Sequence, residues 1–233
     1  MLPIKEILNE YKIKTELHAH TTPVSKCSHI PPESFAEVYM QSGCSAALIT
    51  NHLNPDWIGR SADEYLDDYY RAKKRGDEIG INIILGVEIR FTENINDYLV
   101  YGVEPSDVSK MMTYLDKGLE PFYKEFKRED NLIIHAHPFR KGMTLMPLEF
   151  IDGIESFNLH HAHNSKVAVA ARFARENSLL VTGGSDYHDP DQHALCLMRS
   201  KETPKDSHDI VKILNSRDYL FDASGSLILP YGY

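Results

Sequence analysis

The sequence is poor in cysteine and contains no long hydrophobic run. Its three cysteines, Cys27, Cys44 and Cys196, are odd in number and widely spaced, which argues against a disulfide framework and indicates a reducing compartment. The longest apolar runs, such as residues 45–50 and 131–134, have the length of strands and are too short to span a bilayer. Residues 1–6 lack the charged-then-apolar pattern of a signal peptide. We therefore expect a cytoplasmic protein without a membrane-spanning segment.

The sequence also lacks an excess of basic residues. Its formal net charge of −9 argues against a broad basic face, so an extended nucleic acid is not expected as a partner. Bound divalent cations would nevertheless make a pocket of carboxylates and imidazoles locally positive. With 233 residues, of which 42% are hydrophobic and 25% charged, the chain can bury a full core, and we expect a single domain over residues 1–233.

Strand-like and helix-like patterns alternate along almost the whole chain. We expect helices at residues 31–41, 63–79, 165–176 and 206–215, and one or two more within 105–130, where Gly118 and Pro121 break the pattern. Strands are expected at residues 13–20, 45–50, 82–91, 98–103, 132–137, 153–158, 179–182, 194–198 and 219–222. Such alternation is typical of an α/β fold with a largely parallel sheet, closed or open.

Histidine is the abundant functional residue, with twelve in the chain, and several of them lie where an expected strand ends. The carboxyl ends of parallel strands form one rim of the fold, and active sites are built there. Polar side chains from distant parts of the sequence are therefore predicted to converge. The residues at these strand ends are His18, His20, His52, Glu88, His137, Asp186 and His188.

The spacing of His18 and His20 indicates a metal site. Residues two apart in a strand point to the same face, so both imidazoles can reach one cation. Imidazole and carboxylate together suit Zn²⁺, Mn²⁺ or Fe²⁺ and differ from a structural site of four cysteines. Glu88 could bridge two cations, since each of its oxygens can bind one. Two neighbouring metals can generate hydroxide from water at neutral pH and neutralise charge on a phosphoryl group.

Other histidines have a simpler interpretation. His29, His193 and His208 are expected to be ordinary surface or core residues. His135 shares the spacing of the strand that leads to His137, and we interpret it either as an auxiliary group behind the ligands or as a core residue. The run His160, His161 and His163 follows a strand, and it either lines the pocket or forms a solvated loop.

These motifs, in this order, resemble the polymerase and histidinol phosphatase (PHP) family. The matching segments extend over residues 17–188, and they are Leu17-His18-Ala19-His20-Thr21, Ile49-Thr50-Asn51-His52, Gly86-Val87-Glu88, Ala136-His137-Pro138 and Gly184-Ser185-Asp186-Tyr187-His188. The resemblance implies a distorted (β/α)7 TIM-like barrel with two or three divalent metal ions, and hydrolysis of phosphate esters by a water that the metals activate. It implies that one metal is held by His18, His20, Glu88 and Asp186, that Glu88 and His137 share a second, and that His52 and His188 belong to a third. It also gives Glu88, Asp186 and His188 the catalytic positions.

Three positions depart from the family pattern. Asn51 stands where relatives usually have aspartate, so the support of His52 is expected to be weaker. The ligand that follows His20 at some distance is Cys27 or Lys26 here, and a thiolate is a softer ligand. After Glu88, where many relatives have a histidine, only Asp97 is available.

The expected partner is a small phosphorylated substrate or a short nucleotide. Arg140 follows the His137-Pro138 turn and could clamp phosphate oxygens, with Lys26 as a lesser candidate and Arg60 as a surface residue. Two other hypotheses stay open. An amidohydrolase-type enzyme that cleaves C–N or C–O bonds also begins with His-x-His, although that class commonly uses a modified lysine where this chain has Glu88. The third possibility is a barrel that binds metal without catalysis.

Overall fold

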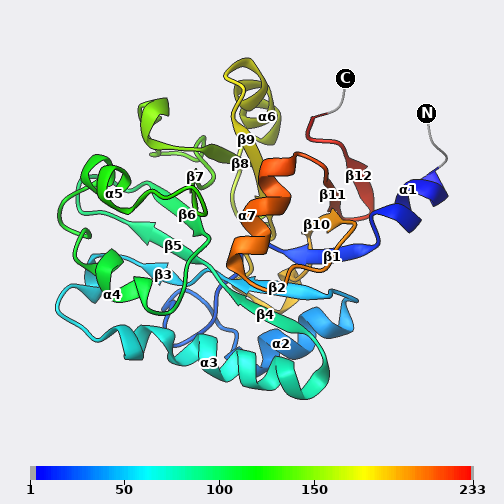
Figure 1. Cartoon of the computed structure of the whole chain (residues 1–233), viewed down its shortest axis with the longest axis horizontal. Coiled ribbons are helices and arrows are strands. Elements are labelled where there is room, and N and C mark those ends of the chain that lie inside the picture. The colour runs from blue at the N-terminus through cyan, green and yellow to red at the C-terminus, as the bar shows by residue number, and fades with distance from the viewer. Residues whose placement is uncertain (1–3, 232–233) are drawn as a thin grey trace.

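The computed structural model describes residues 4–231 and combines helices with two six-stranded sheets (Figure 1). The helices of this part of the chain are α1 (Ile4–Glu10), α2 (Pro32–Gln41), α3 (Ala62–Ile79), α4 (Asp107–Met112), α5 (Leu119–Phe126), α6 (Val167–Glu176) and α7 (Ser207–Ser216). The strands are β1 (Ile13–Glu16), β2 (Ala46–Ile49), β3 (His52–Leu53), β4 (Asn82–Leu85), β5 (Val87–Arg90), β6 (Asp97–Tyr101), β7 (Leu132–His135), β8 (Gly153–Asn158), β9 (Leu180–Gly184), β10 (Cys196–Ser200), β11 (Leu220–Ala223) and β12 (Ser226–Ile228). The α/β class is therefore confirmed.

The two sheets have the strand orders β12-β11-β10-β1-β2-β4 and β3-β5-β6-β7-β8-β9. Among the pairings of residues 4–231, five are parallel and five antiparallel, so the expectation of a largely parallel sheet was wrong. β5 is joined to β6, and β11 to β12, without a helix between them, and both pairs are antiparallel. The pairs β6–β7 and β10–β11 are also antiparallel, although α4 and α5 lie between the first two strands and α7 between the second two.

The chain passes from the first sheet to the second at two points. β2 continues into β3 after two residues, and β4 continues into β5 after Gly86. A Cβ at Gly86 would lie 2.8 Å from Cγ2 of Thr50, so only glycine permits this close approach of the two segments. The strand expected at 82–91 is therefore split, and the residues after the split belong to the second sheet.

Two strands that lead to predicted ligands end earlier than expected. β1 ends at Glu16, although residues 13–20 were expected to be one strand. The reason is local, since the Glu16 carboxylate accepts hydrogen bonds from the backbone N–H groups of Leu17 and His18 at 3.1 and 3.0 Å. Likewise β7 ends at His135 instead of residue 137. In both cases the histidines of interest lie just beyond the strand.

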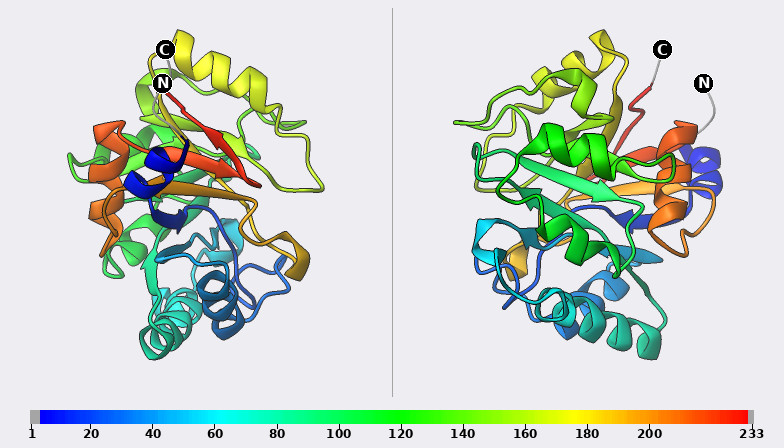
Figure 2. Two further views of the ribbon diagram at one scale, coloured as in Figure 1. Left: turned by 90° about the vertical axis from the view of Figure 1, so that its right-hand side faces the viewer. Right: turned by 60° about the vertical axis from the view of Figure 1, so that its left-hand side comes forward.

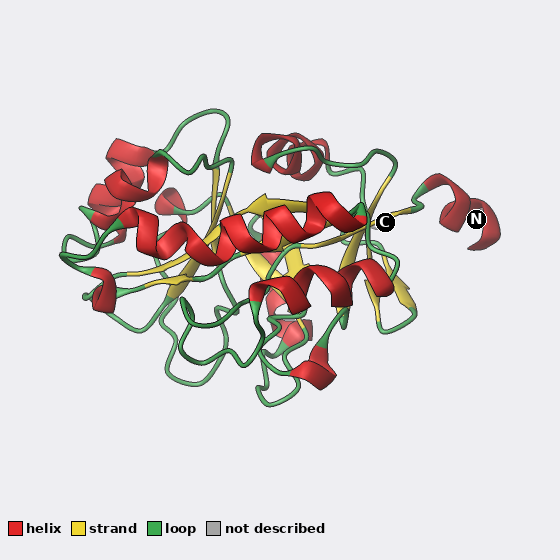
Figure 3. Ribbon diagram, turned by 90° about the horizontal axis from the view of Figure 1, so that it is seen from below, coloured by secondary structure: helices red, strands yellow, loops and turns green. Residues whose placement is uncertain are grey.

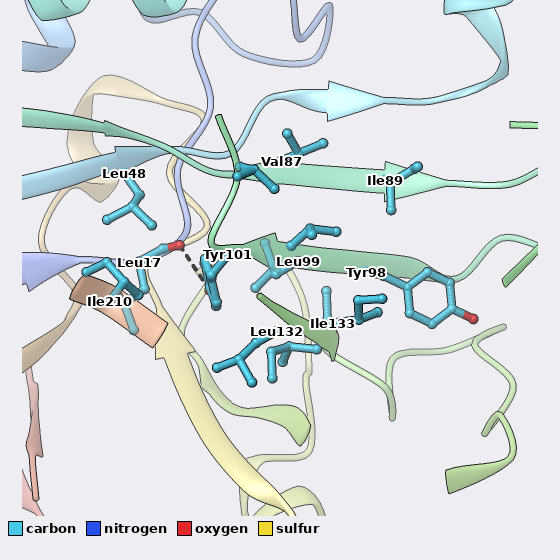
Figure 4. Packing of buried hydrophobic residues seen from close by; sticks show 14 of the residues in the cluster. Leu17, Leu48, Val87, Ile89, Tyr98, Leu99, Tyr101, Leu132, Ile133 and Ile210 are labelled. Atoms are coloured by element: carbon cyan, nitrogen blue, oxygen red, sulfur yellow. Dashed lines mark hydrogen bonds between the residues drawn. The ribbon is translucent and has the colours of Figure 1, made fainter. Parts of the chain in front are cut away.

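The hydrophobic core lies between the sheets and the helices that cover them. Figure 4 shows Val87 and Leu99 of the second sheet near Leu48 of the first sheet and near Leu17, which directly follows β1, and all four belong to one buried cluster. The hydroxyl of Tyr101 donates a hydrogen bond to the carbonyl oxygen of Leu17 at 3.2 Å, which fixes the residue directly before His18.

The helices α2 and α3 lie side by side on one face of the first sheet (Figure 3). α3 begins after Ser61, whose hydroxyl accepts from the N–H of Asp63, and ends at Gly80 with φ of 89°, as the sequence predicted. The helix buries Asp68 together with its apolar face, and this carboxylate points toward the segment after His20. Figure 2 shows α6 and α7 on other sides of the sheets, well apart from this pair. None of the helices in residues 4–231 has the length and apolar character needed to cross a membrane.

Candidate metal centre

The segments after β1 and β9 bring three of the predicted ligands together. The N–H of Asp186 donates to the carbonyl oxygen of His18 at 2.8 Å, and the N–H of His20 donates to that of Tyr187 at 3.0 Å. A parallel bridge between Ala19 and Tyr187 continues this pairing. The imidazoles of His18 and His20 consequently face the Asp186 carboxylate, with each Nε2 3.4 Å from Oδ1.

Glu88 is the centre of the cluster and is fully buried. Its Oε1 lies 3.1 Å from Nε2 of His137 and 3.4 Å from Nε2 of His18. Its Oε2 lies 2.9 Å from Nδ1 of His52 and 3.2 Å from Nε2 of His20. One carboxylate therefore contacts four imidazoles from three separate segments, which is the arrangement expected of a ligand shared between two cations.

The tautomers of His18 and His20 follow from their hydrogen bonds. Nδ1 of His18 lies 2.8 Å from the Glu155 carboxylate and must donate to it. Nδ1 of His20 lies 3.2 Å from Oγ of Ser25, whose own proton goes to Asn51. In the neutral rings, both Nε2 atoms then carry lone pairs, yet they lie only 3.1 Å apart. Two lone pairs at this distance repel each other unless a proton or a metal ion lies between the two nitrogens.

Two further buried atoms of the cluster are also placed where a cation could contact them. Nδ1 of His137 has no hydrogen-bond partner in the described residues, and the contacts of Oε2 of Glu88 with the imidazoles of His52 and His20 do not have hydrogen-bond geometry. Ligand atoms from this cluster form four groups, each within 4.8 Å: His18, His20 and Asp186; His18, Glu88 and His137; His52, Glu88 and Asp97; and His20, His52 and His188. The mixture of nitrogen and oxygen donors suits Zn²⁺, Mn²⁺ or Fe²⁺, so the residues fit a divalent metal centre.

The charges of the cluster compensate one another strongly. Burial favours the neutral imidazole, but the surrounding carboxylates, Glu155 first, raise the pKa of His18 well above its usual range. Burial likewise disfavours ionisation of Glu88, but His18 and His52 lower the pKa of Glu88 well below its usual range. The pKa of Asp186 is lowered well below its usual range against burial, chiefly by His18 and a hydrogen bond from His20. In the absence of metal, protons on the imidazoles supply the positive charge that the carboxylates require.

Backbone conformation marks the same residues. His137 has φ of 31° and Asp186 has φ of 51°. Residues other than glycine adopt such positive φ values only at a cost in conformational energy. Beside them, a Cβ at Gly184 would lie 2.4 Å from Cβ of His18, so glycine is required where β9 approaches the first ligand. Both His137 and Asp186 turn their side chains toward the cluster.

Two buried glutamates that sequence reasoning missed hold the ligands in place. Glu155, in β8, accepts from Nδ1 of His18 and from the N–H of His137 at 3.1 Å. Glu16 accepts from the N–H of His18 and from the N–H and hydroxyl of Ser185. Burial raises the pKa of Glu16, although the hydrogen bonds from Ser185 oppose it. The available signal was a glutamate within each otherwise strand-like segment, at Thr15-Glu16-Leu17 and Ile154-Glu155-Ser156.

Asn51 supports a different residue from the one expected. Its Oδ1 accepts from the hydroxyl of Ser25 at 3.0 Å, and Ser25 in turn contacts Nδ1 of His20 and the backbone N–H of His52. Its Nδ2 lies 3.4 Å from Asp68 of α3. The carboxylate that relatives are expected to have at position 51 is thus replaced by that of Asp68, and Asn51 contacts both Asp68 and Ser25.

Two of the predicted basic residues and Asp97 are already paired. Arg140 donates through Nη2 to Oδ2 of Asp186 and to Asn158. Asp97 forms a two-point ion pair with Arg90 at 2.7 and 2.6 Å, although its Oδ2 is also 3.9 Å from Nε2 of His137. Lys26 pairs with Asp56 at 2.9 Å on the cavity wall. Arg90 is a further cation of the site that the sequence did not indicate.

The remaining candidates lie around the cluster. Cys27 lines the cavity and its thiol is near His52, but it joins none of the four groups of ligand atoms in residues 4–231. Arg60 pairs with Glu64 and covers the ring of Trp57, which is the surface role expected of it.

The remaining histidines differ in their surroundings. His135 is buried beside Tyr98, both of its ring nitrogens lack partners in the described residues, and burial lowers its pKa to about 3. His188 donates through Nδ1 to the carbonyl oxygen of Asp186, and burial lowers its pKa to about 3, so Nε2 keeps a lone pair. The ring of His160 meets that of His188 edge-on, and His160 and His163 line the cavity, whereas His161 contacts Gln192. Of the three histidines in this run, His160 and His163 therefore line the pocket, as one of the two interpretations predicted.

The cluster opens into a cavity of about 840 Å³. His52, Asp97, His137, Asp186 and His188 are at its wall, and His18, His20 and Glu88 lie buried behind them. A cavity of this size can enclose a whole small molecule. The structure therefore brings together all the histidines and acids that the sequence placed at strand ends.

Comparison with known proteins identifies the fold. No family model matches the sequence, and no curated protein matches it significantly. A two-domain protein of Bacteroides vulgatus, containing a predicted PHP-like metal-dependent phosphoesterase, aligns with a TM-score of 0.63 at 16% identity over 91% of this chain. This chain covers 64% of that protein, less than two thirds of its length. A candidate metal-dependent phosphoesterase of Bifidobacterium adolescentis aligns with a TM-score of 0.53 at 16% identity, over 86% of this chain and 95% of that one.

A third neighbour belongs to a different class by name. An amidohydrolase of Chromobacterium violaceum, with bound sulfate and no metal, aligns with a TM-score of 0.55 at 13% identity, over 87% of this chain and 96% of that one. At these identities the likeness concerns the fold. The predicted resemblance to PHP-like proteins is confirmed at that level.

Proposed function

We propose that the protein is a metal-dependent phosphoesterase acting on a small phosphorylated molecule or a short nucleotide. The observation that carries the proposal is the close approach of the Nε2 atoms of His18 and His20, 3.1 Å apart, beside a Glu88 carboxylate that contacts four imidazoles. The phosphoesterase names of two structural neighbours support the reaction class.

The proposal includes the finer fold and the ligand assignment. The continuity of β2 with β3 and of β4 with β5, and the Ala19–Tyr187 bridge, support a distorted (β/α)7 barrel. We assign two or three Zn²⁺, Mn²⁺ or Fe²⁺ ions to the groups of ligand atoms given above, in which Asp97 joins one group only. Cys27, which lines the cavity near His52, is a further candidate ligand outside these groups. When bound, such ions lower the pKa of a water molecule and neutralise charge on phosphoryl oxygens.

The protein's own residues orient the substrate and move protons. Arg140 lies at the cavity wall, and its hydrogen bonds in the described residues use Nε and Nη2, which leaves Nη1 for a phosphate oxygen. His188 presents Nε2 with its lone pair, either to a cation or to a proton released in the reaction. Glu155 keeps the Nδ1 proton of His18 in place and thereby the ligand form of Nε2.

The test combines metal analysis with a substrate panel. The purified protein is loaded with Mn²⁺ or Zn²⁺, its metal content is measured, and phosphomonoesters, phosphodiesters, amides and lactones are assayed. We expect phosphate-ester hydrolysis, lowered at least about a hundredfold in Glu88→Gln and unchanged in the exposed control Glu149→Gln. Hydrolysis confined to amides or lactones would instead support the amidohydrolase alternative, which the third neighbour favours. Full metal occupancy with no turnover would indicate a barrel that binds metal without catalysis.

A further inference from the structure

One wall of the cavity carries uncompensated positive charge. Five lysine and arginine side chains line the cavity, and three of them form ion pairs with aspartates. The other two, Lys141 and Lys166, are exposed and have no acidic partner within ion-pair distance in residues 4–231. In a protein with a net charge of −9, two unpaired cations beside one cavity are a local reversal of the overall charge.

Hydrogen bonds hold the segments that carry these lysines against each other. Nε of Arg140 donates to Oγ of Ser165 at 3.2 Å. Both Nη2 of Arg140 and Oγ of Ser165 also donate to Oδ1 of Asn158, at 2.6 and 3.0 Å. Because Lys141 directly follows Arg140 and Lys166 directly follows Ser165, both lysines belong to one wall, next to the Arg140 guanidinium that contacts Asp186.

The start of α6 adds to the positive potential of this wall. Lys166 is the residue before the first turn, no side chain caps the helix there, and the first turn contains no acidic residue. The backbone N–H groups of the first turn therefore keep their partial positive charge. Lys166 itself has φ of 51°, and its N–H donates to Oδ1 of Asn164 at 3.0 Å, which fixes the backbone from which its side chain projects.

We propose that Lys141 and Lys166 form a second anion subsite, which selects phosphate esters whose alcohol part carries another anionic group, either a phosphate or a carboxylate. This proposal rests on the proposed function, in which the reacting phosphate lies between the metal cluster and Arg140. The second group of the same molecule then lies beside the two lysines. The cavity of about 840 Å³ has room for both ends of such a substrate.

Binding of stable phosphonates tests the subsite without requiring turnover. Calorimetry on the Mn²⁺-loaded protein would compare propylphosphonate, which has one anionic group, with 3-phosphonopropanoate and propane-1,3-diphosphonate, which have two. We expect the second group to tighten binding about tenfold, as two exposed charge pairs can provide. Lys141→Met with Lys166→Met should remove this gain and leave the affinity for propylphosphonate within about twofold. The difference between the carboxylate and the second phosphonate decides which anion the subsite prefers.

A matched control and two contrary outcomes complete the test. Lys74→Met removes an exposed lysine of α3 that does not line the cavity, and it should preserve the gain. Equal affinity for all three probes in the wild type, or a gain that survives the double substitution, would overturn the subsite. These outcomes differ from failure of the proposed function, which would appear as tight phosphonate binding without hydrolysis of any phosphate ester.

Discussion

Replacement of Glu155 by glutamine tests whether a carboxylate behind the cluster sets its affinity for metal. Glu155 is buried, and its two oxygens serve different segments. Oε1 accepts from Nδ1 of His18 at 2.8 Å, while Oε2 accepts from the N–H of His137 at 3.1 Å and from Nδ2 of Asn158 at 3.0 Å. Glutamine keeps the shape but offers a single acceptor oxygen, so one set of donors must face its NH₂ group.

The size of the effect follows from these contacts. A carboxylate on Nδ1 makes Nε2 of His18 a stronger ligand and fixes its tautomer, and loss of such a partner costs about 10–100-fold in metal affinity. This corresponds to about 1.4–2.7 kcal/mol. The protein without metal should change less, because the substitution also removes one negative charge from a cluster that already holds Glu88 and Asp186.

The assay is competition for Mn²⁺ or Zn²⁺ between the protein and a chelating dye, accompanied by urea unfolding of the metal-free form. Glu149→Gln, at an exposed position, is the control. An affinity of Glu155→Gln within twofold of the wild type, with the fold intact by circular dichroism, would refute the reasoning, because the hydrogen bond to His18 would then have no influence on the ligand.

Three more predictions concern packing and charge around the site. Gly184→Ala should weaken metal binding about tenfold and lower stability by about 1–3 kcal/mol, since the new Cβ would lie 2.4 Å from Cβ of His18. His135→Leu should make the stability of the protein less sensitive to acid, because burial lowers the pKa of His135 to about 3. Between about pH 3 and 6.5 the unfolded wild-type chain binds a proton at His135 that the folded chain does not bind. The wild type therefore loses stability as the pH falls, by up to about 1.4 kcal/mol per pH unit. Asn51→Asp should destabilise the metal-free protein by about 1–3 kcal/mol, because it places a carboxylate 3.4 Å from Asp68, and Asp68→Asn should restore part of the loss.

Urea unfolding checks the stability terms, and dye competition checks the affinity. Unchanged metal binding in Gly184→Ala would mean that β9 can move away from the first ligand. An identical pH dependence of His135→Leu and wild type between pH 4 and 6 would mean that His135 is protonated in the fold. Additive effects of Asn51→Asp and Asp68→Asn would show that the two side chains do not interact.

Local sequence patterns predicted most helices and strands, because the residues that begin, end and pattern such an element lie close together in the sequence. The helix expected at 63–79 is α3, with Ser61 and Gly80 at its ends, and the strand expected at 153–158 coincides with β8. The split at Gly86 was not predictable in the same way, because it depends on the contact of that residue with Thr50 of another segment. The proportion of parallel strands was also missed, since pairing depends on which distant strand lies alongside.

The convergence of the strand-end residues was predictable from the architecture alone. His18 and His20 follow the end of β1, and they meet Glu88, which lies near the start of β5 just after the chain leaves β4. Their supporting groups were not found, because Glu155 and Asp68 lie within a strand and a helix, where a single acidic residue has no distinctive pattern. Arg90 was missed for the same reason, and its pairing with Asp97 changes the expected role of that aspartate.

The chemistry of the buried cluster explains why these hidden partners matter. Glu88 and Asp186 are ionised in a region without solvent, which is costly unless positive charge lies close by. In the metal-free protein, the raised pKa values of His18 and His52 mean that protons supply this charge. A cation bound to Nε2 of His18 must displace such a proton, and the Glu155 carboxylate on Nδ1 favours either occupant. The same geometry can therefore hold the fold together with protons and accept metal ions in their place, so the ligands need no large movement when a metal binds.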